Sequence, residues 1–361
     1  MDIHLLQYIE NLSMKHYIYN KYKTFDIFQY KIKNPFNSDS GFFGQIINEF
    51  CLGDFKNNSD VEKFIYETFS SVKIKHKNSE WVWDEHYEHY PLDEIVLFLE
   101  KVWKDLDIKK ELMVITSDIH ADYSHLSSQF DFYFTLHNMR LHHRRPDFTA
   151  KYEGNCKYKF FLQGGSLRQD RTYIGDEFKK IIPNEFYAST ISDNPFNQGA
   201  DSSGKMKYTY SQMFNLMDAS HIMFVNETIR PGGDYFYDTF KGTETRVRTG
   251  YTEKTGNAIL FKKPFFLNSN PYSLYNLREL GFKTFGEVWD ESYDEKPNQK
   301  DRIDGIMNNI KWLSKIGDGG FAKVARKFKE ITEHNYKHLT EEMTIYDGMK
   351  LYKPSEFNFK I

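Results

Sequence analysis

Short apolar runs alternate with helical patterns through the second half of the chain, and this alternation restricts the fold more than any other feature. Apolar runs of this length, bounded by glycine or polar residues, are typical of buried strands. Strands that alternate with helices build largely parallel sheets, because a crossover connects each strand to the next. The predicted strands are 157–163, 221–225 and 264–267, and the predicted helices are 170–181, 211–219, 252–263 and 273–280.

Two more helical patterns lie near the C-terminus. Apolar residues recur at helical spacing from Ile303 to Leu313 and again from Phe321 to Ile331. The glycine-rich segment 317–320 lies between them. Because glycine is unfavourable inside a helix, we expect this segment to separate two helices.

The first half of the chain shows the same alternation more weakly. Residues 92–103 form an amphipathic helical pattern, and two apolar runs, 112–115 and 130–136, follow as strands of a largely parallel sheet. Residues 34–60 and 76–90 are polar, aromatic and irregular, so we expect long loops there. The apolar face of the predicted helix consists of Ile95, Phe98, Leu99 and Val102.

A basic stretch with little periodicity, 138–152, is interrupted by Pro146 and indicates a linker between the halves. A chain of 361 residues is long enough for two domains of ordinary size. We therefore predict an α/β fold with two doubly wound domains and a ligand cleft between them. The domains are expected at residues 1–150 and 151–335, with a C-terminal tail, 336–361, that returns to the first domain.

Composition limits the partners and the compartment. The net charge is −3, so any site for an anion must be local. The two cysteines, Cys51 and Cys156, provide neither a disulfide framework nor a metal cluster. The N-terminus lacks the features of a signal peptide, and no apolar stretch approaches the ~20 residues of a membrane span. We expect a soluble cytoplasmic monomer that does not bind membranes.

Residues 164–171, GGSLRQDR, join the predicted strand 157–163 to the helix that follows it. Glycines at such a turn let the backbone approach a ligand closely, and the first turn of a helix offers free N–H groups. Arginine adds a planar fork of donors that matches phosphate oxygens. This combination predicts a pyrophosphate site that includes Arg168 and Arg171.

A second motif, Tyr251–Thr255 (YTEKT), opens another predicted helix. A glutamate in the first turn of a helix is able to accept hydrogen bonds from both hydroxyls of a nucleotide ribose, which suggests this role for Glu253. Lys254 beside it and Arg248 before it are candidates to meet a diphosphate. The alternative is structural, with Thr252 as the helix cap and Glu253 as a complement to the helix dipole.

The GGSLRQDR turn resembles the diphosphate-binding turn of phage DNA β-glucosyltransferases that modify 5-hydroxymethylcytosine, in which two arginines follow a GGS turn. The YTEKT segment is similar to the donor-binding segment of α1,3-fucosyltransferases and of phage glycosyltransferase-like proteins. Both families have the GT-B architecture of two Rossmann-like domains facing a central cleft, so the resemblance, although limited to short motifs, implies this fold. It also implies that Gly165, Ser166, Arg168 and Arg171 hold the diphosphate and that Glu253 binds the ribose.

Two departures from the family pattern concern the donor. Arg171 lies one residue closer to Ser166 than the second arginine of the phage enzymes does. Gly250 stands where those enzymes have an arginine, three residues before the ribose glutamate. Arg248 or Lys254 must therefore take the place of that arginine.

Thr116–His120 (TSDIH) directly follows the predicted strand 112–115 and is similar to a strand-end Thr-Asp-Ile of the same phage family, whose aspartate resembles a general base. A carboxylate at the carboxyl end of a parallel strand lies where such sheets bind ligands. An inverting transfer needs one base to take the acceptor proton. We predict Asp118 in this role, with His120 and Asp122 as further candidates; the alternative is an aspartate that caps a loop.

A basic patch occupies the expected linker and consists of His142, His143, Arg144 and Arg145. It is suited to hold DNA phosphates even in a chain of negative net charge; the alternative is an exposed linker. The histidines of this region show no spacing of the HExxH kind and have no cysteine nearby to complete a site, so we predict no metal.

Together these motifs predict a metal-independent glycosyltransferase of phage or viral origin, without a cofactor, whose co-substrate is a nucleoside-diphosphate sugar, with a UDP-sugar favoured. The predicted acceptor is a hydroxymethylated pyrimidine in double-stranded DNA, which must be flipped out of the stack to react. One alternative acceptor is a glycan or a small molecule, as in the fucosyltransferases. From a different class, the alternative is a non-catalytic protein that binds nucleic acid through its arginines.

Overall fold

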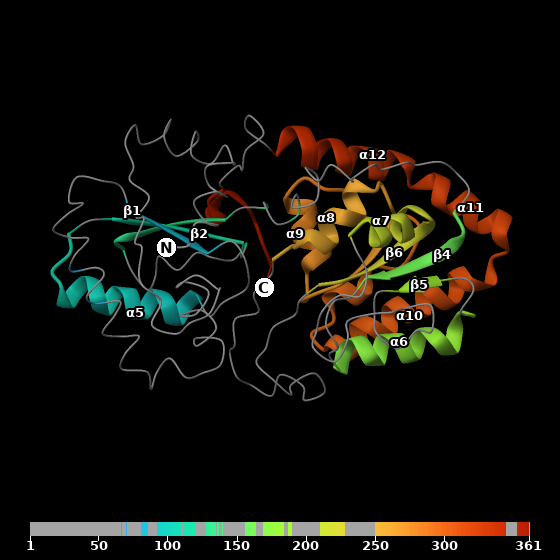
Figure 1. Ribbon diagram of the computed structural model, residues 1–361, viewed down its shortest axis with the longest axis horizontal. Coiled ribbons are helices and arrows are strands. Elements are labelled where there is room, and N and C mark those ends of the chain that lie inside the picture. The colour runs from blue at the N-terminus through green and yellow to red at the C-terminus, as the bar shows by residue number, and fades with distance from the viewer. Residues whose placement is uncertain are drawn as a thin grey trace. The chain divides into compact units, whose positions relative to one another are not determined.

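The computed structural model has an α/β fold with two compact units, each containing a parallel sheet (Figure 1). The first unit comprises Met1–His137 and Met343–Glu356, and the second comprises Asn138–Glu342 and Phe357–Ile361, so the chain passes between them three times. The residues that the structure describes are 66, 70, 81–85, 92–109, 111–117, 119, 128–134, 136, 139, 156–163, 169–183, 187–189, 210–227, 250–343 and 352–360.

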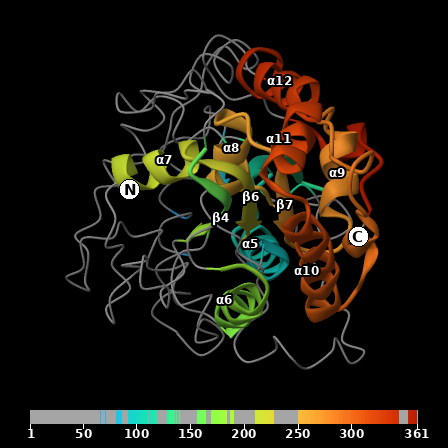
Figure 2. The same cartoon turned by 90° about the vertical axis from the view of Figure 1, so that its right-hand side faces the viewer.

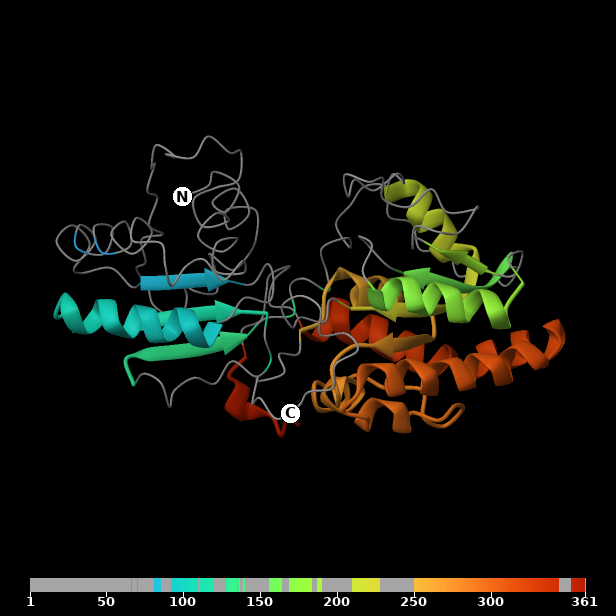
Figure 3. The same ribbon diagram turned by 90° about the horizontal axis from the view of Figure 1, so that it is seen from below.

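Among the described residues of the first unit, three parallel strands form a sheet in the order β1-β2-β3. The strands are β1 (Trp81–Glu85), β2 (Leu112–Thr116) and β3 (Phe130–Phe134). Helix α5 (Leu92–Asp105) covers one face of the sheet (Figures 1 and 3). The helix and the two strands predicted for this half are therefore confirmed.

The predicted apolar face of α5 is confirmed at Leu99 and Val102, which are buried. Trp103 is buried beside them, and its ring meets that of Phe130 edge-on at a centroid distance of 5.3 Å. This contact packs the helix against β3. The side chains of the other two predicted face residues are not among those described.

Strand β1 lies where a loop was expected, so the prediction of a long loop over 76–90 is wrong at Trp81–Glu85. These five residues pair in parallel with β2, from Trp81 opposite Leu112 to Glu85 opposite Thr116. The physical reason is the high strand propensity of tryptophan and valine in the sequence WVWDE. Acidic residues flank the short apolar run, so the sequence pattern did not indicate a strand.

The C-terminal segment makes paired contacts in both units. Tyr352 and Phe134 exchange backbone hydrogen bonds of 3.0 and 2.9 Å, and their rings stack at 5.3 Å. In the second unit, the backbone N–H of Lys360 donates to Asn276 Oδ1 at 2.8 Å, and Asn276 Nδ2 donates to the Lys360 carbonyl at 2.9 Å. The last residues of the chain are thus held by β3 in one unit and by a buried asparagine in the other.

The sheet of the second unit has four parallel strands in the order β5-β4-β6-β7. They are β4 (Tyr158–Gln163), β5 (Tyr187–Ser189), β6 (Ser220–Asn226) and β7 (Phe265–Asn268). Three of these strands confirm predicted ones, whereas the short β5 was not predicted. Most of their side chains are buried, as expected for a sheet with both faces covered.

Helices cover both faces of this sheet (Figures 1 and 2). On one face lie α6 (Gln169–Ile181) and α10 (Gln299–Lys315), and on the other lie α7 (Tyr210–Asp218) and α8 (Glu253–Leu260). The other helices in the described part of the second unit are α9 (Ser273–Glu279), α11 (Asp318–Lys327) and α12 (Lys329–Lys337). Short helical turns lie at Ser292–Glu295, His338–Glu342 and Pro354–Glu356. Among the described residues, no helix is both long and apolar enough to cross a membrane.

Helix α8 lies directly against the backbone of Met139 at Gly256. A Cβ atom placed on Gly256 would stand 1.7 Å from the Met139 carbonyl oxygen. Atoms of separate residues never approach this closely, so only glycine permits the contact. Met139 itself is fully buried, which places this contact in the core of the second unit.

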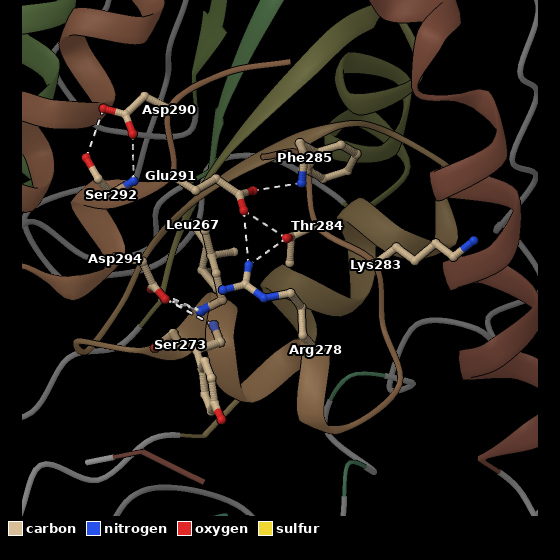
Figure 4. A network of polar contacts seen from close by, with 12 residues as sticks. Leu267, Ser273, Arg278, Lys283, Thr284, Phe285, Asp290, Glu291, Ser292 and Asp294 are labelled. Carbon is tan, nitrogen blue, oxygen red and sulfur yellow. Dashed lines mark hydrogen bonds and ion pairs between the residues drawn. The ribbon is translucent and has the colours of Figure 1, made fainter. Parts of the chain in front are cut away.

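Two carboxylates organise the segment after β7 (Figure 4). Asp294 is buried and accepts hydrogen bonds from the backbone N–H groups of Leu274, at 2.9 and 3.0 Å, and Tyr275, at 3.0 Å. These are first-turn donors of α9, so Asp294 satisfies groups that the helix itself leaves unpaired. Glu291 accepts from the backbone N–H of Phe285 at 2.7 Å and from Arg278 at 3.1 Å.

The buried Asp294 predicts a pH dependence of stability. Burial raises the pKa of Asp294 from 3.8 to about 6, outweighing the backbone hydrogen bonds that lower it. The folded chain therefore binds this proton more tightly than the unfolded chain does. We expect the contribution of Asp294 to the free energy of unfolding to fall by up to about 3 kcal/mol as the pH rises from about 4 to about 6.

Urea unfolding of the wild type and of Asp294→Asn, from pH 4 to pH 8, measures this contribution as the difference between the two proteins. Other titrating groups are common to both and largely cancel in that difference. A difference that stays constant across this range would show that burial does not raise the pKa.

Candidate functional site

The strand order of the second unit defines a switch point between β4 and β6. The chain leaves β4 through α6 to reach β5 on one side, whereas β6 lies on the other side. Connections that diverge in this way open a crevice at the carboxyl ends of the two strands, and open α/β sheets bind their ligands there. The segment predicted to bind diphosphate, 164–171, begins at the carboxyl end of β4.

Polar residues end three strands at this edge of the sheet. Gln163, Asn226 and Asn268 are the last residues of β4, β6 and β7, and all three are buried. Asn268 Nδ2 donates to Asn226 Oδ1 at 2.5 Å. Within the described part of the chain, Gln163 Oε1, Asn226 Nδ2 and Asn268 Oδ1 have no hydrogen-bond partner. Because buried polar groups are nearly always paired, this edge has hydrogen-bonding capacity beyond what its neighbours use.

Glu227 follows β6 and joins it to the first turn of α8. Its side chain is only 1% exposed. The carboxylate accepts from the backbone N–H groups of Thr252 and Thr255, at 3.0 and 3.1 Å, and from the hydroxyl groups of both residues. The backbone N–H of Glu227 donates to the Asn268 carbonyl at 3.0 Å, which continues the pairing of β6 with β7. One buried carboxylate thus fixes the start of α8 to the carboxyl edge of the sheet.

The predicted YTEKT motif forms the start of α8. Thr252 is the N-cap, and its hydroxyl accepts from the backbone N–H of Lys254 at 3.3 Å, so the capping role considered for Thr252 is confirmed. Lys254 Nζ lies 3.1 Å from Thr252 Oγ1, 3.3 Å from Glu253 Oε1 and 3.8 Å from Glu227 Oε2. Among the charged side chains of this cluster, Glu253 is 33% exposed and Lys254 is 11% exposed. A ligand that reaches this turn therefore meets Glu253 first.

The sequence analysis did not identify Glu227, although Glu227 has the feature that identified Asp118, a carboxylate shortly after an apolar strand. Asp118 was singled out because a carboxylate follows an apolar strand, and Glu227 follows the run 221–225 after one intervening residue. Its hydrogen-bond partners lie 25 and 28 residues further along the chain. No local pattern predicts that pairing.

Arg171 lies in the first turn of α6 and is buried, with 2% of its surface exposed. A buried guanidinium is held by the surrounding protein, so its orientation at this end of β4 is set by packing. Two residues further on, the Tyr173 hydroxyl donates to Asp304 Oδ1 at 2.7 Å and joins α6 to α10. The start of α6 is thereby fixed against α10 by a half-buried hydrogen bond.

Several predicted site residues lie outside the described part of the chain. For the donor these are Gly165, Ser166, Arg168 and Arg248, and for the acceptor they are Asp118, His120, Asp122 and the basic patch 142–145. Thr116 and Ser117, which precede Asp118 at the end of β2, are buried. The structure therefore brings together Glu253 and Lys254 and adds Glu227 to them.

In the ranges described, no three His, Cys, Asp or Glu side chains are grouped closely enough to hold a metal ion.

Comparisons with known proteins found no family model, no curated protein and no solved structure that matches the chain.

Proposed function

We propose that the protein is a GT-B glycosyltransferase that transfers a sugar from a nucleoside-diphosphate sugar, with UDP-sugar favoured, to a hydroxymethylated pyrimidine in DNA. The observation that carries the proposal is the carboxyl edge of the second sheet. A switch point, buried amides and the accessible Glu253 occur there together. The motifs of the sequence supply the reaction type and the acceptor.

In the proposed donor site, the starts of two helices bind different parts of the nucleotide. Glu253, at the start of α8, accepts hydrogen bonds from the ribose hydroxyls. Arg168 and Arg171, with Gly165 and Ser166 of the same turn, hold the diphosphate at the start of α6. Arginines placed at the leaving diphosphate stabilise the charge that develops there, which is usually the largest single contribution to catalysis.

On the acceptor side, Asp118 is the proposed general base. Its carboxylate takes the proton of the acceptor hydroxyl as that oxygen bonds to the anomeric carbon, and the bond from this carbon to the diphosphate breaks. His120 is the second candidate for this proton. The basic patch 142–145 holds DNA phosphates while the target base is flipped out of the duplex.

A second candidate acceptor is a glycan or a small molecule with a free hydroxyl. It is favoured by the YTEKT segment at the start of α8, the part of the proposed donor site that resembles fucosyltransferases. The distinguishing experiment incubates hydroxymethylated and unmodified duplexes with a panel of nucleotide sugars and measures the mass of the base. Sugar on glycans or small molecules but not on DNA would establish this second acceptor. DNA binding without nucleotide-sugar binding would instead establish a non-catalytic protein.

We expect Glu253→Ala to weaken the binding of uridine and of UDP by a similar factor, about tenfold or more, because the contact removed is a charge-assisted hydrogen bond to ribose. Arg171→Ala should weaken UDP binding and leave uridine binding nearly unchanged. Isothermal titration calorimetry with both ligands separates these effects.

Glu287→Ala is the matched control, since Glu287 is exposed in the same unit and its loss should alter neither affinity. If Glu253→Ala changed only the affinity for UDP, or neither affinity, the assignment of Glu253 to ribose would be wrong.

A further inference from the structure

We propose that Glu227 determines what the first turn of α8 binds: it reserves this turn for the hydroxyl groups of the donor and keeps phosphate away from it. The inference rests on the proposed donor function and adds a specificity-determining residue to that site. Glu227 is not the contact itself, because its two carboxylate oxygens already accept four hydrogen bonds from Thr252 and Thr255. It acts by accepting hydrogen bonds from the N–H and hydroxyl groups of Thr252 and Thr255, which a ligand then cannot use.

The first turn of a helix with an adjacent lysine is ordinarily a site for anions. In α8, Glu227 already accepts from the N–H groups of Thr252 and Thr255, so these donors are not available to a phosphate. Of the residues that the structure describes, the charged side chains at this turn are Glu227, Glu253 and Lys254, and these two carboxylates and one ammonium sum to a formal charge of −1. A phosphate would be repelled here rather than attracted.

Lys254 interacts with the other polar side chains at the start of α8. Lys254 Nζ donates a hydrogen bond to Thr252 Oγ1 at 3.1 Å. It also forms ion pairs with Glu253 Oε1 at 3.3 Å and Glu227 Oε2 at 3.8 Å. A phosphate would have to displace these oxygens from a side chain that is only 11% exposed. Lys254 therefore orients the Glu253 carboxylate, and the diphosphate is left to the arginines at the start of α6.

The accessible group at this turn is a hydrogen-bond acceptor. Glu253 is 33% exposed, and a carboxylate accepts hydrogen bonds but donates none. Ligand hydroxyls are able to donate hydrogen bonds to this carboxylate, whereas a phosphate dianion has no hydrogen to donate. The chemical class that fits the turn is accordingly a vicinal diol such as that of ribose.

The test uses inorganic pyrophosphate and uridine as separate probes in calorimetric titrations of the full-length protein. We expect Lys254→Met to change pyrophosphate affinity less than about twofold, because Lys254 does not hold phosphate in the wild type. Glu227→Gln keeps the shape of the side chain but removes its charge, and should raise pyrophosphate affinity about tenfold, the equivalent of one charge-assisted hydrogen bond. The double variant Glu227→Gln/Lys254→Met should lose that gain, and uridine affinity should stay unchanged in Glu227→Gln.

Thr255→Val is the control for stability, since it removes one hydrogen bond to Glu227 without changing any charge. It should lower the urea midpoint and leave pyrophosphate affinity unchanged. A tenfold loss of pyrophosphate affinity in Lys254→Met, or no gain in a folded Glu227→Gln, would overturn the inference. If Glu227→Gln does not fold, the Lys254→Met result decides. A wild type that binds neither uridine, UDP nor pyrophosphate would overturn the proposed function as well, whereas tight UDP binding that depends on Lys254 would overturn this inference alone.

Discussion

Asp118→Asn is expected to lower the rate of sugar transfer by about 10²–10⁴-fold while the affinity for UDP changes little. The substitution keeps the shape of the side chain and removes the group that takes the acceptor proton. Donor binding is assigned to the second unit, so it should be insensitive to this change. Initial rates of transfer to hydroxymethylated DNA, together with calorimetric titration of UDP, measure the two effects separately.

Asp131→Asn is the matched control in the same unit. Asp131 lies in β3 and pairs with Lys353 at 3.0 Å, so its loss removes a charge and an ion pair but no proposed catalytic group. Turnover should be nearly unchanged in this variant. Near-normal turnover in Asp118→Asn would transfer the role of base to His120 or Asp122, or indicate a retaining mechanism that does not use this base.

Gly256→Ala is expected to destabilise the protein by more than about 3 kcal/mol, beyond the usual range for an overpacked core. The added methyl group would stand 1.7 Å from the Met139 carbonyl oxygen. The backbone of α8 fixes the position of Cβ, and the oxygen belongs to the backbone of Met139, so no side-chain rotation relieves the overlap and α8 must move away from Met139. Urea denaturation of both proteins, followed by far-UV circular dichroism, measures the loss.

Gly319→Ala provides the comparison, because a Cβ at Gly319 in α11 has no neighbour within 4 Å. Alanine is the better helix former, so this variant should be as stable as the wild type or gain up to about 1 kcal/mol. If Gly256→Ala were equally harmless, α8 could not lie as close to Met139 as the structure places it. The pair of variants separates a close approach from the general effect of replacing glycine in a helix.

Periodicity predicted most of the described helices and strands, because burial and periodicity have the same origin, but it missed β1 and β5. The helix expected at 211–219 is α7, Tyr210–Asp218, and the strand expected at 264–267 is β7, Phe265–Asn268. Strand β5 has three residues, too few for a period, and is defined by its pairing with β4.

Glycine misled the interpretation near the C-terminus. Helix α11 begins at Asp318, so the segment 317–320 does not lie wholly between helices as predicted. The single helix expected over 321–331 is also divided, since α11 ends at Lys327 and α12 begins at Lys329. Phe328, between them, is fully buried and packs against Phe285 and Trp289, so tertiary packing coincides with the break.

In the candidate site too, residues with local sequence signals were predicted, whereas a residue that depends on long-range contacts was not. Thr252 and Lys254 were found because capping and charge at a helix start are local features. Glu227 was not, because its role depends on hydrogen bonds to residues that the fold, and not the sequence order, brings beside it. Buried polar groups at strand ends are set by tertiary structure, which makes the functional edge of a sheet harder to predict than the sheet itself.

The C-terminal segment has a consequence for the order in which the chain folds as it leaves the ribosome. Domains generally fold as units during synthesis, N-terminal first. Here Tyr352 pairs with Phe134 of β3, so this contact of the first unit forms only after nearly the whole second unit has been synthesised. The second unit is in turn completed by Lys360 on Asn276. The residues that complete the two units, Tyr352 and Lys360, are therefore synthesised close together in time, after almost all of the residues with which they pack.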